Sequence, residues 1–158
     1  MMRSNLIEWV YHSELDHFMT VTLRSALLTP EGFWRPITPE DVKRTAWLLR
    51  DRFTKALVGP AAFKRKEYPP FIAFAEGDGR DKRFHLHAVA SNPLNISEFE
   101  YAELFRRTAR KLDWVHSEID VRPIEKPFNI NTRSVISYCL KDGTNSFLPE
   151  ASFIPDIS

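Results

Sequence analysis

The sequence of 158 residues contains a single cysteine, Cys139, and only five glycines. One cysteine cannot form a disulfide within the chain, which excludes the disulfide-linked scaffolds of small secreted proteins. No stretch approaches the roughly 20 apolar residues that a membrane span requires, and none has the pattern of a signal peptide. We therefore expect a protein of the reducing cytoplasm that does not contact a membrane.

An excess of charge of one sign is also missing, because 22 basic residues oppose 21 acidic ones and the net charge is +1. The field of the whole protein thus gives little reason to expect a nucleic-acid partner. Local basic clusters are more often solvated surface than binding sites, so they are weak evidence on their own. The clusters that could follow a DNA backbone comprise Lys64, Arg65, Lys66, Arg80, Lys82 and Arg83.

The length and the 43% of apolar residues predict one domain, residues 1–158, with a core at about 17–143 and a tail at 144–158. Its central motif is a strand at residues 83–90 that carries His85 and His87. Alternate side chains of a strand share a face, so both imidazoles project from one face while Leu86 points to the other. Two imidazoles on a rigid face supply part of a metal coordination shell. The alternative is that both histidines are merely packed or surface residues.

Glu76 is the candidate third ligand. It ends a second apolar strand at residues 70–76, and the polar, glycine-rich stretch 77–82 leads back into the histidine strand. These features predict an antiparallel hairpin. A register that places Glu76 opposite His85 or diagonal to His87 brings all three groups to one face, whereas a slip of one residue separates them.

The remaining patterns predict a strand at 17–24, with Phe18, Thr20 and Thr22 on one face, and another at 118–122. Thr38 and the Pro39 that follows it predict the start of a helix that Gly59-Pro60 ends. A second helix should begin at Ser97 and bury Phe99, Ala102, Phe105, Ala109 and Leu112. The segment 28–38 has too many breakers for a regular element. The sequence does not assign a role to residues 1–16.

This order of elements predicts an α+β fold of the ferredoxin-like (split β-α-β) kind. Its four-stranded antiparallel sheet would carry two helices on one face and leave the other face open beside the histidines. A third short helix, near that other face, is expected at 131–143, capped by Asn131 or Thr132 and ended by Gly143. Tyr138 and Lys141 are neighbours on its surface.

The motifs together resemble the HUH superfamily of single-strand DNA nucleases, in particular the replication initiators (Rep) of rolling-circle replication. His85-Leu86-His87 resembles the histidine-hydrophobe-histidine motif, Glu76 the acidic residue of the preceding strand, and residues 138–141 the Tyr-x-x-Lys motif. The strand at 19–24 is similar to the first, less specific motif. Relaxases place the tyrosine before the histidines, unlike this chain, and single-tyrosine transposases usually carry glutamine where Lys141 stands.

The resemblance implies that a Mn²⁺ or Mg²⁺ ion is held by His85, His87 and Glu76, and that Tyr138 is the nucleophile, helped by Lys141. It further implies nicking and joining of single-stranded DNA, at an origin or a hairpin, through a 5′-phosphotyrosine intermediate, and initiation of replication of a plasmid or phage. The stretch 144–158 is too short for a helicase domain, so a host or element-encoded helicase is an expected partner.

Three alternatives remain open. A single-tyrosine transposase would use the same chemistry. A non-catalytic nucleic-acid module of the same fold would bind without metal, because such modules stack bases on aromatic residues of an open sheet. A metal-dependent hydrolase of small phosphoesters would need neither the tyrosine nor the basic clusters. Among the other tyrosines, Tyr101 belongs to the helix on the opposite face, Tyr11 lies outside the matched region, and nothing in the sequence fixes the ring of Tyr68.

Overall fold

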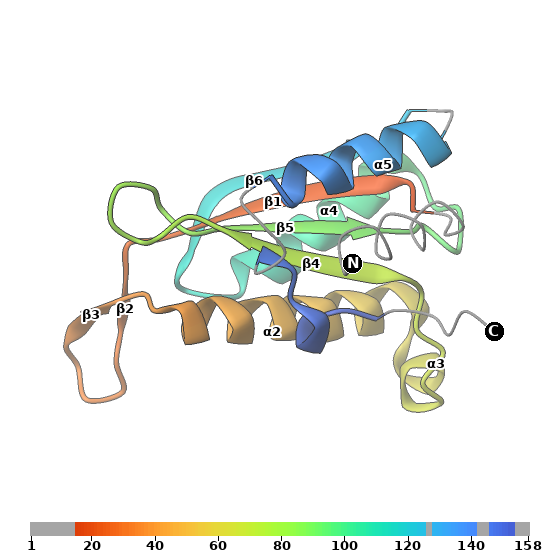
Figure 1. Ribbon diagram of the computed structural model, residues 1–158. Helices are drawn as coiled ribbons and strands as arrows, with labels where there is room; N and C mark the ends of the chain where they lie inside the picture. The colour runs from red at the N-terminus through yellow and green to blue at the C-terminus, as the bar shows by residue number, and fades with distance from the viewer. Residues whose placement is uncertain (1–14, 126–127, 142–145, 154–158) are drawn as a thin grey trace.

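The computed structural model describes residues 15–125, 128–141 and 146–153. It is an α+β structure in which helices lie on both faces of a four-stranded antiparallel sheet (Figure 1). The sheet order is β4-β5-β1-β6, and the strands are β1 (His17–Leu23), β4 (Phe71–Glu76), β5 (His85–Ala90) and β6 (Val115–Pro123). The expected α+β class and the four-stranded antiparallel sheet are confirmed.

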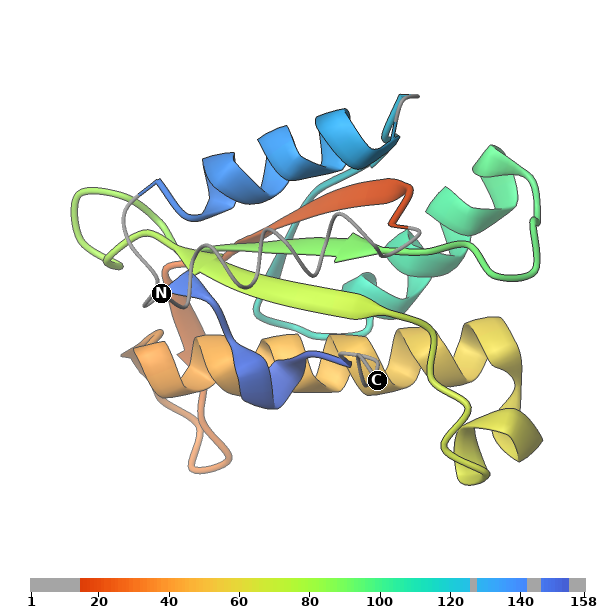
Figure 2. The ribbon, with the colours of Figure 1, turned by 45° about the vertical axis from the view of Figure 1, so that its right-hand side comes forward.

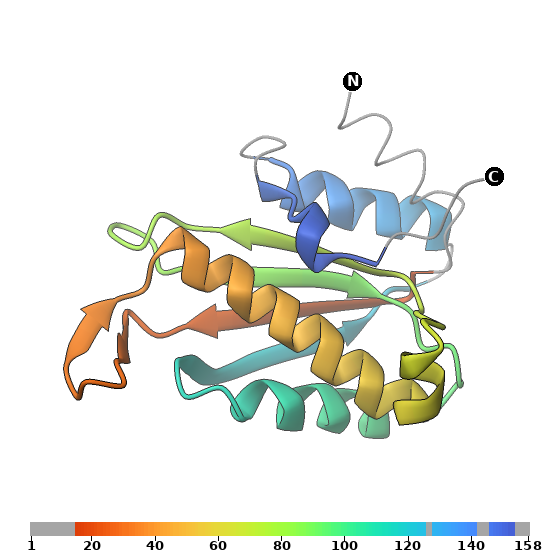
Figure 3. The ribbon, with the colours of Figure 1, turned by 90° about the horizontal axis from the view of Figure 1, so that it is seen from below.

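Two long helices, α2 (Pro39–Val58) and α4 (Glu98–Arg110), cover one face of the sheet (Figure 3). As predicted, Thr38 caps α2: its hydroxyl accepts from the Asp41 amide, and the Asp41 carboxylate accepts from the Thr38 amide. Gly59 ends α2, and a short helix α3 (Pro60–Lys64) follows directly. In the described part of the chain, no helix is both long and apolar enough to cross a membrane.

The main core lies between these helices and the sheet. Met19, Val21 and Leu23 of β1 are buried there, and so are Leu86 and Ala88 of β5. Their alternation along each strand leaves the intervening residues for the opposite face. The histidines of β5 are therefore directed away from α2 and α4, as predicted.

The buried stripe of α4 matches the expected one in part, because Phe105, Ala109 and Leu112 are buried as predicted. Phe99 is 75% exposed, whereas Tyr101 is fully buried and packs its ring edge-on against Phe53. The Tyr101 hydroxyl donates to the Ser91 carbonyl, which satisfies its polar end inside the core. A buried tyrosine needs such a partner, and this partner is not visible in the periodicity of the helix.

A small hairpin, β2 (Ala26–Leu28) and β3 (Trp34–Pro36), replaces the loop expected at 28–38. The prediction was wrong because two of the breaking residues, Pro30 and Gly32, lie in the turn and not in the strands. Gly32 has φ of +91°, a conformation that favours glycine. Pro36 is the last residue of a strand that has a single partner, where its missing amide hydrogen does no harm.

The second face of the sheet carries α5 (Phe128–Cys139), as Figure 2 shows. A smaller core joins them, with Ile72, Phe74 and Val89 from the sheet and Ile136 and Leu140 from the α5 region. This face is thus partly covered and not fully open.

The helix α5 begins before the position expected from the sequence. It starts at Phe128, so Asn131 and Thr132 lie inside it, and the prediction that one of them caps it was wrong. The Asn131 amide instead donates to the Glu125 carbonyl. The predicted end at Gly143 lies outside the described residues.

The segment 146–153, expected as part of a tail, belongs to the core. Phe147 and Phe153 pair with Phe74 and Phe71 along the outer edge of β4, next to the 3₁₀ turn η2 (Pro149–Ala151). Leu148 and Ala151 are buried in the main core. Covering the edge of β4 protects it from pairing with another chain.

Candidate functional site

The β4–β5 hairpin has the register that a shared site requires. Glu76 pairs with His85, and Phe74 pairs with His87. A Cβ atom at Gly77, whose φ is +100°, would lie 2.3 Å from the Arg83 carbonyl oxygen. Only glycine fits at this position, so the tight turn helps to fix the register. The register predicted from the sequence is confirmed.

Glu76 is the centre of a compact group of charges. Its Oε2 atom lies 2.6 Å from Nε2 of His87, and its Oε1 atom lies 3.0 Å from Nζ of Lys141. The Lys82 ammonium also contacts Oε1. The Glu76 side chain is 10% exposed and that of His87 is 6% exposed. Residues from β4, β5, their connection and the end of α5 thus converge on one carboxylate.

These contacts determine the protonation of the pair. Burial raises the pKa of Glu76, but hydrogen bonds from Lys82, His87 and Lys141 outweigh burial and lower it to about 2. Burial lowers the pKa of His87, and this effect exceeds the opposing effect of the Glu76 carboxylate. At neutral pH the site therefore combines an ionised carboxylate with a neutral imidazole.

Each histidine also has a contact through its Nδ1 atom. Nδ1 of His85 lies 2.9 Å from the Arg83 carbonyl oxygen, which only accepts, so His85 carries its proton on Nδ1 and keeps the lone pair on Nε2. Nδ1 of His87 lies 3.0 Å from the Thr20 hydroxyl oxygen. Because the ionised Glu76 carboxylate only accepts, the neutral His87 ring carries its proton on Nε2, and its Nδ1 accepts from the Thr20 hydroxyl. Outer contacts of this kind orient histidines that bind metals.

Thr20 and Phe18 were not predicted as site residues. Phe18 stacks on the His87 ring, with the ring centroids 5.4 Å apart, and Thr20 pairs directly with His87 across β1 and β5. The alternation of β1 had placed both on the second face. The sequence alone does not show the register of β1 beside β5, so His87 could not be identified as the residue that Phe18 and Thr20 contact.

Tyr138 lies in the last turn of α5, above the histidine strand. Its ring centroid is 6.0 Å from that of His87, in an edge-on arrangement, and Nζ of Lys141 lies 4.1 Å from the centre of the tyrosine ring. Tyr138 is 49% exposed. Contacts with the Glu76 carboxylate and with Tyr138 raise the pKa of Lys141, so this ammonium is charged at neutral pH.

The predicted DNA-binding residues divide into two groups. Arg80, Lys82 and Arg83 lie in the β4–β5 connection, where Lys82 contacts Glu76 directly. Lys64 ends α3 and Arg65 and Lys66 follow it, beyond the opposite end of β4 (Figures 1 and 3). Arg65 forms an ion pair with Glu67 there. The structure therefore brings the first group, but not the second, to the charged site.

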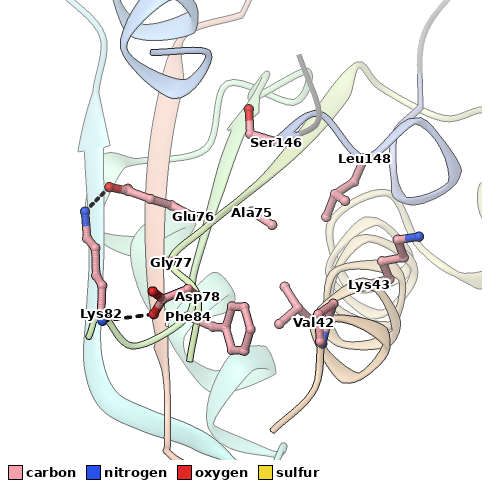
Figure 4. Close-up of a pocket in the computed structure, with 11 residues that line it drawn as sticks. Val42, Lys43, Ala75, Glu76, Gly77, Asp78, Lys82, Phe84, Ser146 and Leu148 are labelled. Atoms are coloured by element: carbon pink, nitrogen blue, oxygen red, sulfur yellow. Dashed lines mark hydrogen bonds and ion pairs between the residues drawn. The ribbon is translucent and has the colours of Figure 1, made fainter. Parts of the chain in front are cut away.

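A pocket of about 440 Å³ adjoins Glu76 on the side of α2. Figure 4 shows Val42, Phe84 and Leu148 on its apolar side, whereas the Glu76 carboxylate and the Lys82 ammonium point to the other side. The apolar wall of this pocket thus takes no part in the charged group. The carboxylate contacts His87 and Lys141 instead.

The donor atoms fit a divalent ion in their chemistry. Glu76, His85 and His87 offer one carboxylate and two imidazoles, a set that suits Mn²⁺ and also binds Mg²⁺. Among these three residues only Glu76 and His87 are in hydrogen-bond contact, and the His85 and His87 ring centroids lie 6.4 Å apart. Within the described residues, no three His, Cys, Asp or Glu side chains already form a ligand cluster. Two lysine ammonium groups balance the charge of Glu76 in this arrangement.

Comparison with known proteins identifies no relative: no family model, no curated protein and no solved structure matches the chain.

Proposed function

We propose that this chain is a metal-dependent endonuclease and strand transferase for single-stranded DNA, of the HUH type that includes the rolling-circle initiators. Tyr138 is the proposed nucleophile, and Glu76, His85 and His87 are the proposed metal ligands. The observation that carries the proposal is the position of Tyr138. Its exposed ring lies beside His87 and under the Lys141 ammonium, and the same ammonium forms an ion pair with Glu76.

The order of the strands supports this assignment. Two β-α-β units, β1-α2-β4 and β5-α4-β6, interleave so that β1 lies between β5 and β6. This order of strands supports our proposal that the fold is ferredoxin-like, with split β-α-β topology. The two central strands then carry the histidines and their partners Phe18 and Thr20.

The other described tyrosines are poor nucleophiles. Tyr101 is fully buried and donates its hydroxyl to the Ser91 carbonyl. Tyr68 stacks on Phe153, with the rings 4.0 Å apart, so the expectation that nothing fixes its ring was wrong. That stack lies at the end of β4 remote from Glu76. Tyr11 lies outside the described residues.

In the proposed reaction, the Tyr138 oxygen attacks the phosphorus of one phosphodiester and the 3′ oxygen of the preceding nucleotide leaves. Tyr138 loses its proton, the leaving oxygen gains one, and the products are a 5′-phosphotyrosine and a free 3′ hydroxyl. Attack by another 3′ hydroxyl reverses the step and joins strands. Lys141, as a cation, stabilises the phenolate and the phosphate oxygens. A divalent ion on Glu76, His85 and His87 would supply further stabilisation of the charge that develops on the phosphate.

Two biological roles follow from this chemistry. Initiation of rolling-circle replication of a plasmid or phage, with a separate helicase, is the role that we propose, because Lys141 stands where single-tyrosine transposases usually carry glutamine. A transposase remains the alternative. A non-catalytic module that binds nucleic acid on an open sheet is less well supported, since α5 packs on the sheet face that such a module would use.

The direct test is capture of the covalent intermediate. The protein is incubated with Mn²⁺ and a random pool of single strands labelled at the 3′ end, and the products are separated in denaturing detergent. We expect label on the protein at Tyr138, and none with Tyr138→Phe; Tyr68→Phe is the matched control and should behave as wild type. Cleavage without a protein-bound product would reject the tyrosine mechanism and favour metal-activated water.

A further inference from the structure

A second cavity, of about 650 Å³, lies between the β2–β3 hairpin, the end of α4 and the start of β6. Its walls include Trp34 of the hairpin, which is 64% exposed, and Trp114 just before β6. Leu28, 55% exposed, pairs with Trp34 across the hairpin. The cavity thus combines two indole rings with an exposed apolar edge, none of which takes part in the site around Glu76.

The hairpin that presents Trp34 is anchored at several points. The Thr29 carbonyl and hydroxyl accept from the amides of Gly32 and Phe33, which closes the turn. At its base the Arg35 guanidinium forms two hydrogen bonds with the Asp41 carboxylate, at 2.6 and 2.9 Å. Large apolar side chains that lie exposed next to one another mark interaction sites.

The polar lining of the cavity is mainly basic. Arg24 and Arg110 line it and are exposed, and neither guanidinium forms an ion pair within the described part of the chain. Asp113 is the single acidic residue of the lining. The indole N–H of Trp114 donates to the Thr45 hydroxyl at 2.6 Å, which fixes that ring. Indole faces beside unpaired guanidinium groups match an unpaired nucleobase and its phosphate.

We propose that this cavity is a subsite for single-stranded DNA, in which Trp34 stacks on one unpaired base and Arg24 and Arg110 bind the neighbouring phosphates. The hairpin projects beyond the same end of the sheet as the β4–β5 connection that carries Lys82 (Figures 1 and 3). The cavity and Glu76 therefore lie at the same end of the sheet, so one single strand of DNA could contact both. The inference rests on the proposed nuclease function and adds where the flanking DNA binds.

The test measures binding separately from chemistry. Tyr138→Phe protein in chelator is titrated with an oligothymidylate of about 15 nucleotides, the upper range of sites on single-strand-binding folds. We expect Trp34→Ala to weaken binding roughly 10-fold or more and Trp34→Phe to restore part of it. Arg110→Ala should weaken binding and lower the salt slope by about 0.7.

Two matched controls are available. Trp47→Ala removes a tryptophan that is 47% exposed on α2 and does not line this cavity, and Arg107→Ala removes an exposed arginine of α4 that does not line it either. Both controls should bind as the parent does. Equal affinity of Trp34→Ala, Arg110→Ala and these controls, or no binding of the oligonucleotide by the parent, would overturn the inference.

The result is independent of the test of the nuclease. A covalent adduct together with an affinity that does not depend on Trp34 and Arg110 would reject the subsite alone. Binding that depends on Trp34 and Arg110, with no adduct in wild type, would reject the nuclease while the cavity remains a single-strand site. If Trp34→Ala does not fold, Arg110→Ala against Arg107→Ala decides the outcome, because both positions are exposed on α4.

Discussion

Nε2 of His87 lies 2.6 Å from Oε2 of Glu76, although eleven residues separate the two in the chain. The hairpin register brings them together and buries both, and Lys82 and Lys141 then balance the carboxylate. Removal of one partner from a pair of this kind strongly destabilises the fold, because the other partner stays buried and charged. Tests of the proposed metal site should therefore begin with the histidine that lies outside the pair.

His85→Ala should abolish binding of Mn²⁺ and formation of the covalent adduct while the fold is kept. His85 is partly exposed, and within the described residues its one hydrogen bond is to the Arg83 carbonyl, so its removal leaves no buried charge there. Calorimetric titration with Mn²⁺ and the adduct assay check this. His116→Ala, a change to a partly exposed histidine of β6, is the control. Full activity of His85→Ala, or of wild type in excess chelator, would contradict the metal assignment.

Lys141→Ala should slow adduct formation by about 100-fold, the usual order for loss of one charged group at a phosphate or oxyanion. Its ammonium contacts Glu76 and lies over the Tyr138 ring. Lys141→Arg keeps the charge and should retain part of the rate. Single-turnover rates at saturating DNA measure the effect, and Lys111→Ala, exposed at the end of α4, serves as the control. Equal rates for all variants would show that Lys141 is a surface residue that does not contribute to adduct formation.

Asp41 predicts an acid-sensitive contribution to stability. The Arg35 hydrogen bond, aided by Thr38, lowers the pKa of Asp41 from 3.8 to about 2 against the opposing effect of burial. Because the folded pKa is depressed, the contribution is complete above pH 3.8 and is lost as the pH falls toward 2. Asp41→Asn should lower the free energy of unfolding by about 1 to 2 kcal/mol at pH 6.

Urea unfolding of wild type and Asp41→Asn at several pH values provides the measurement. The difference between them should shrink to near zero as the pH approaches 2. Glu40→Gln, in the same helical turn but 83% exposed at its side chain, is the matched control. A difference that stays constant with pH would show that the carboxylate charge does not contribute.

Arg50→Ala should detach the segment 146–153 from the core. The guanidinium is buried, donates to the Glu150 carbonyl at 2.8 Å and lies 4.1 Å from the centre of the Phe153 ring. Loss of these contacts should lower the free energy of unfolding by about 2 to 3 kcal/mol. Urea unfolding checks this against Arg52→Ala, which removes an exposed arginine of the same helix. Equal stability of the two variants would be the contrary result.

Salt dependence should separate the two basic clusters. Arg80→Ala with Arg83→Ala should lower the slope of log affinity against log salt by about 1.4 for a short single strand, since each phosphate contact contributes about 0.7. Lys64→Ala with Lys66→Ala should leave the slope unchanged, because those residues lie beyond the opposite end of β4 (Figure 3). An unchanged slope for the first pair would remove the β4–β5 connection from the DNA site.

Local signals in the sequence were sufficient for several parts of this protein. The start of α2 at Thr38, the alternation of β1 and β5, and the hairpin that pairs Glu76 with His85 were all predicted and are all present. Caps, strand alternation and glycine turns act between residues close in sequence, so they can be recognised in one segment at a time.

Errors arose where a residue contacts another element of the fold. The burial of Tyr101 depends on its hydroxyl reaching Ser91 at the end of β5, and the role of the segment 146–153 depends on Arg50 and the edge of β4. Such contacts form only when the sheet has assembled, and helix periodicity does not record them. The early start of α5 is a different case, because the Asn131 amide donates to the Glu125 carbonyl only six residues away, a local contact that the capping pattern did not indicate.

For the candidate site, the sequence by itself determined which residues we propose for the chemistry: two histidines on one strand face, a glutamate on the neighbouring strand of the hairpin, and a tyrosine with a lysine three residues later. Only the tertiary structure decided how they are charged and held. The order β4-β5-β1-β6 places Thr20 and Phe18 against His87, and α5 brings Lys141 to Glu76. Protonation depends on burial and on neighbouring charges, and these exist only once separate segments pack together.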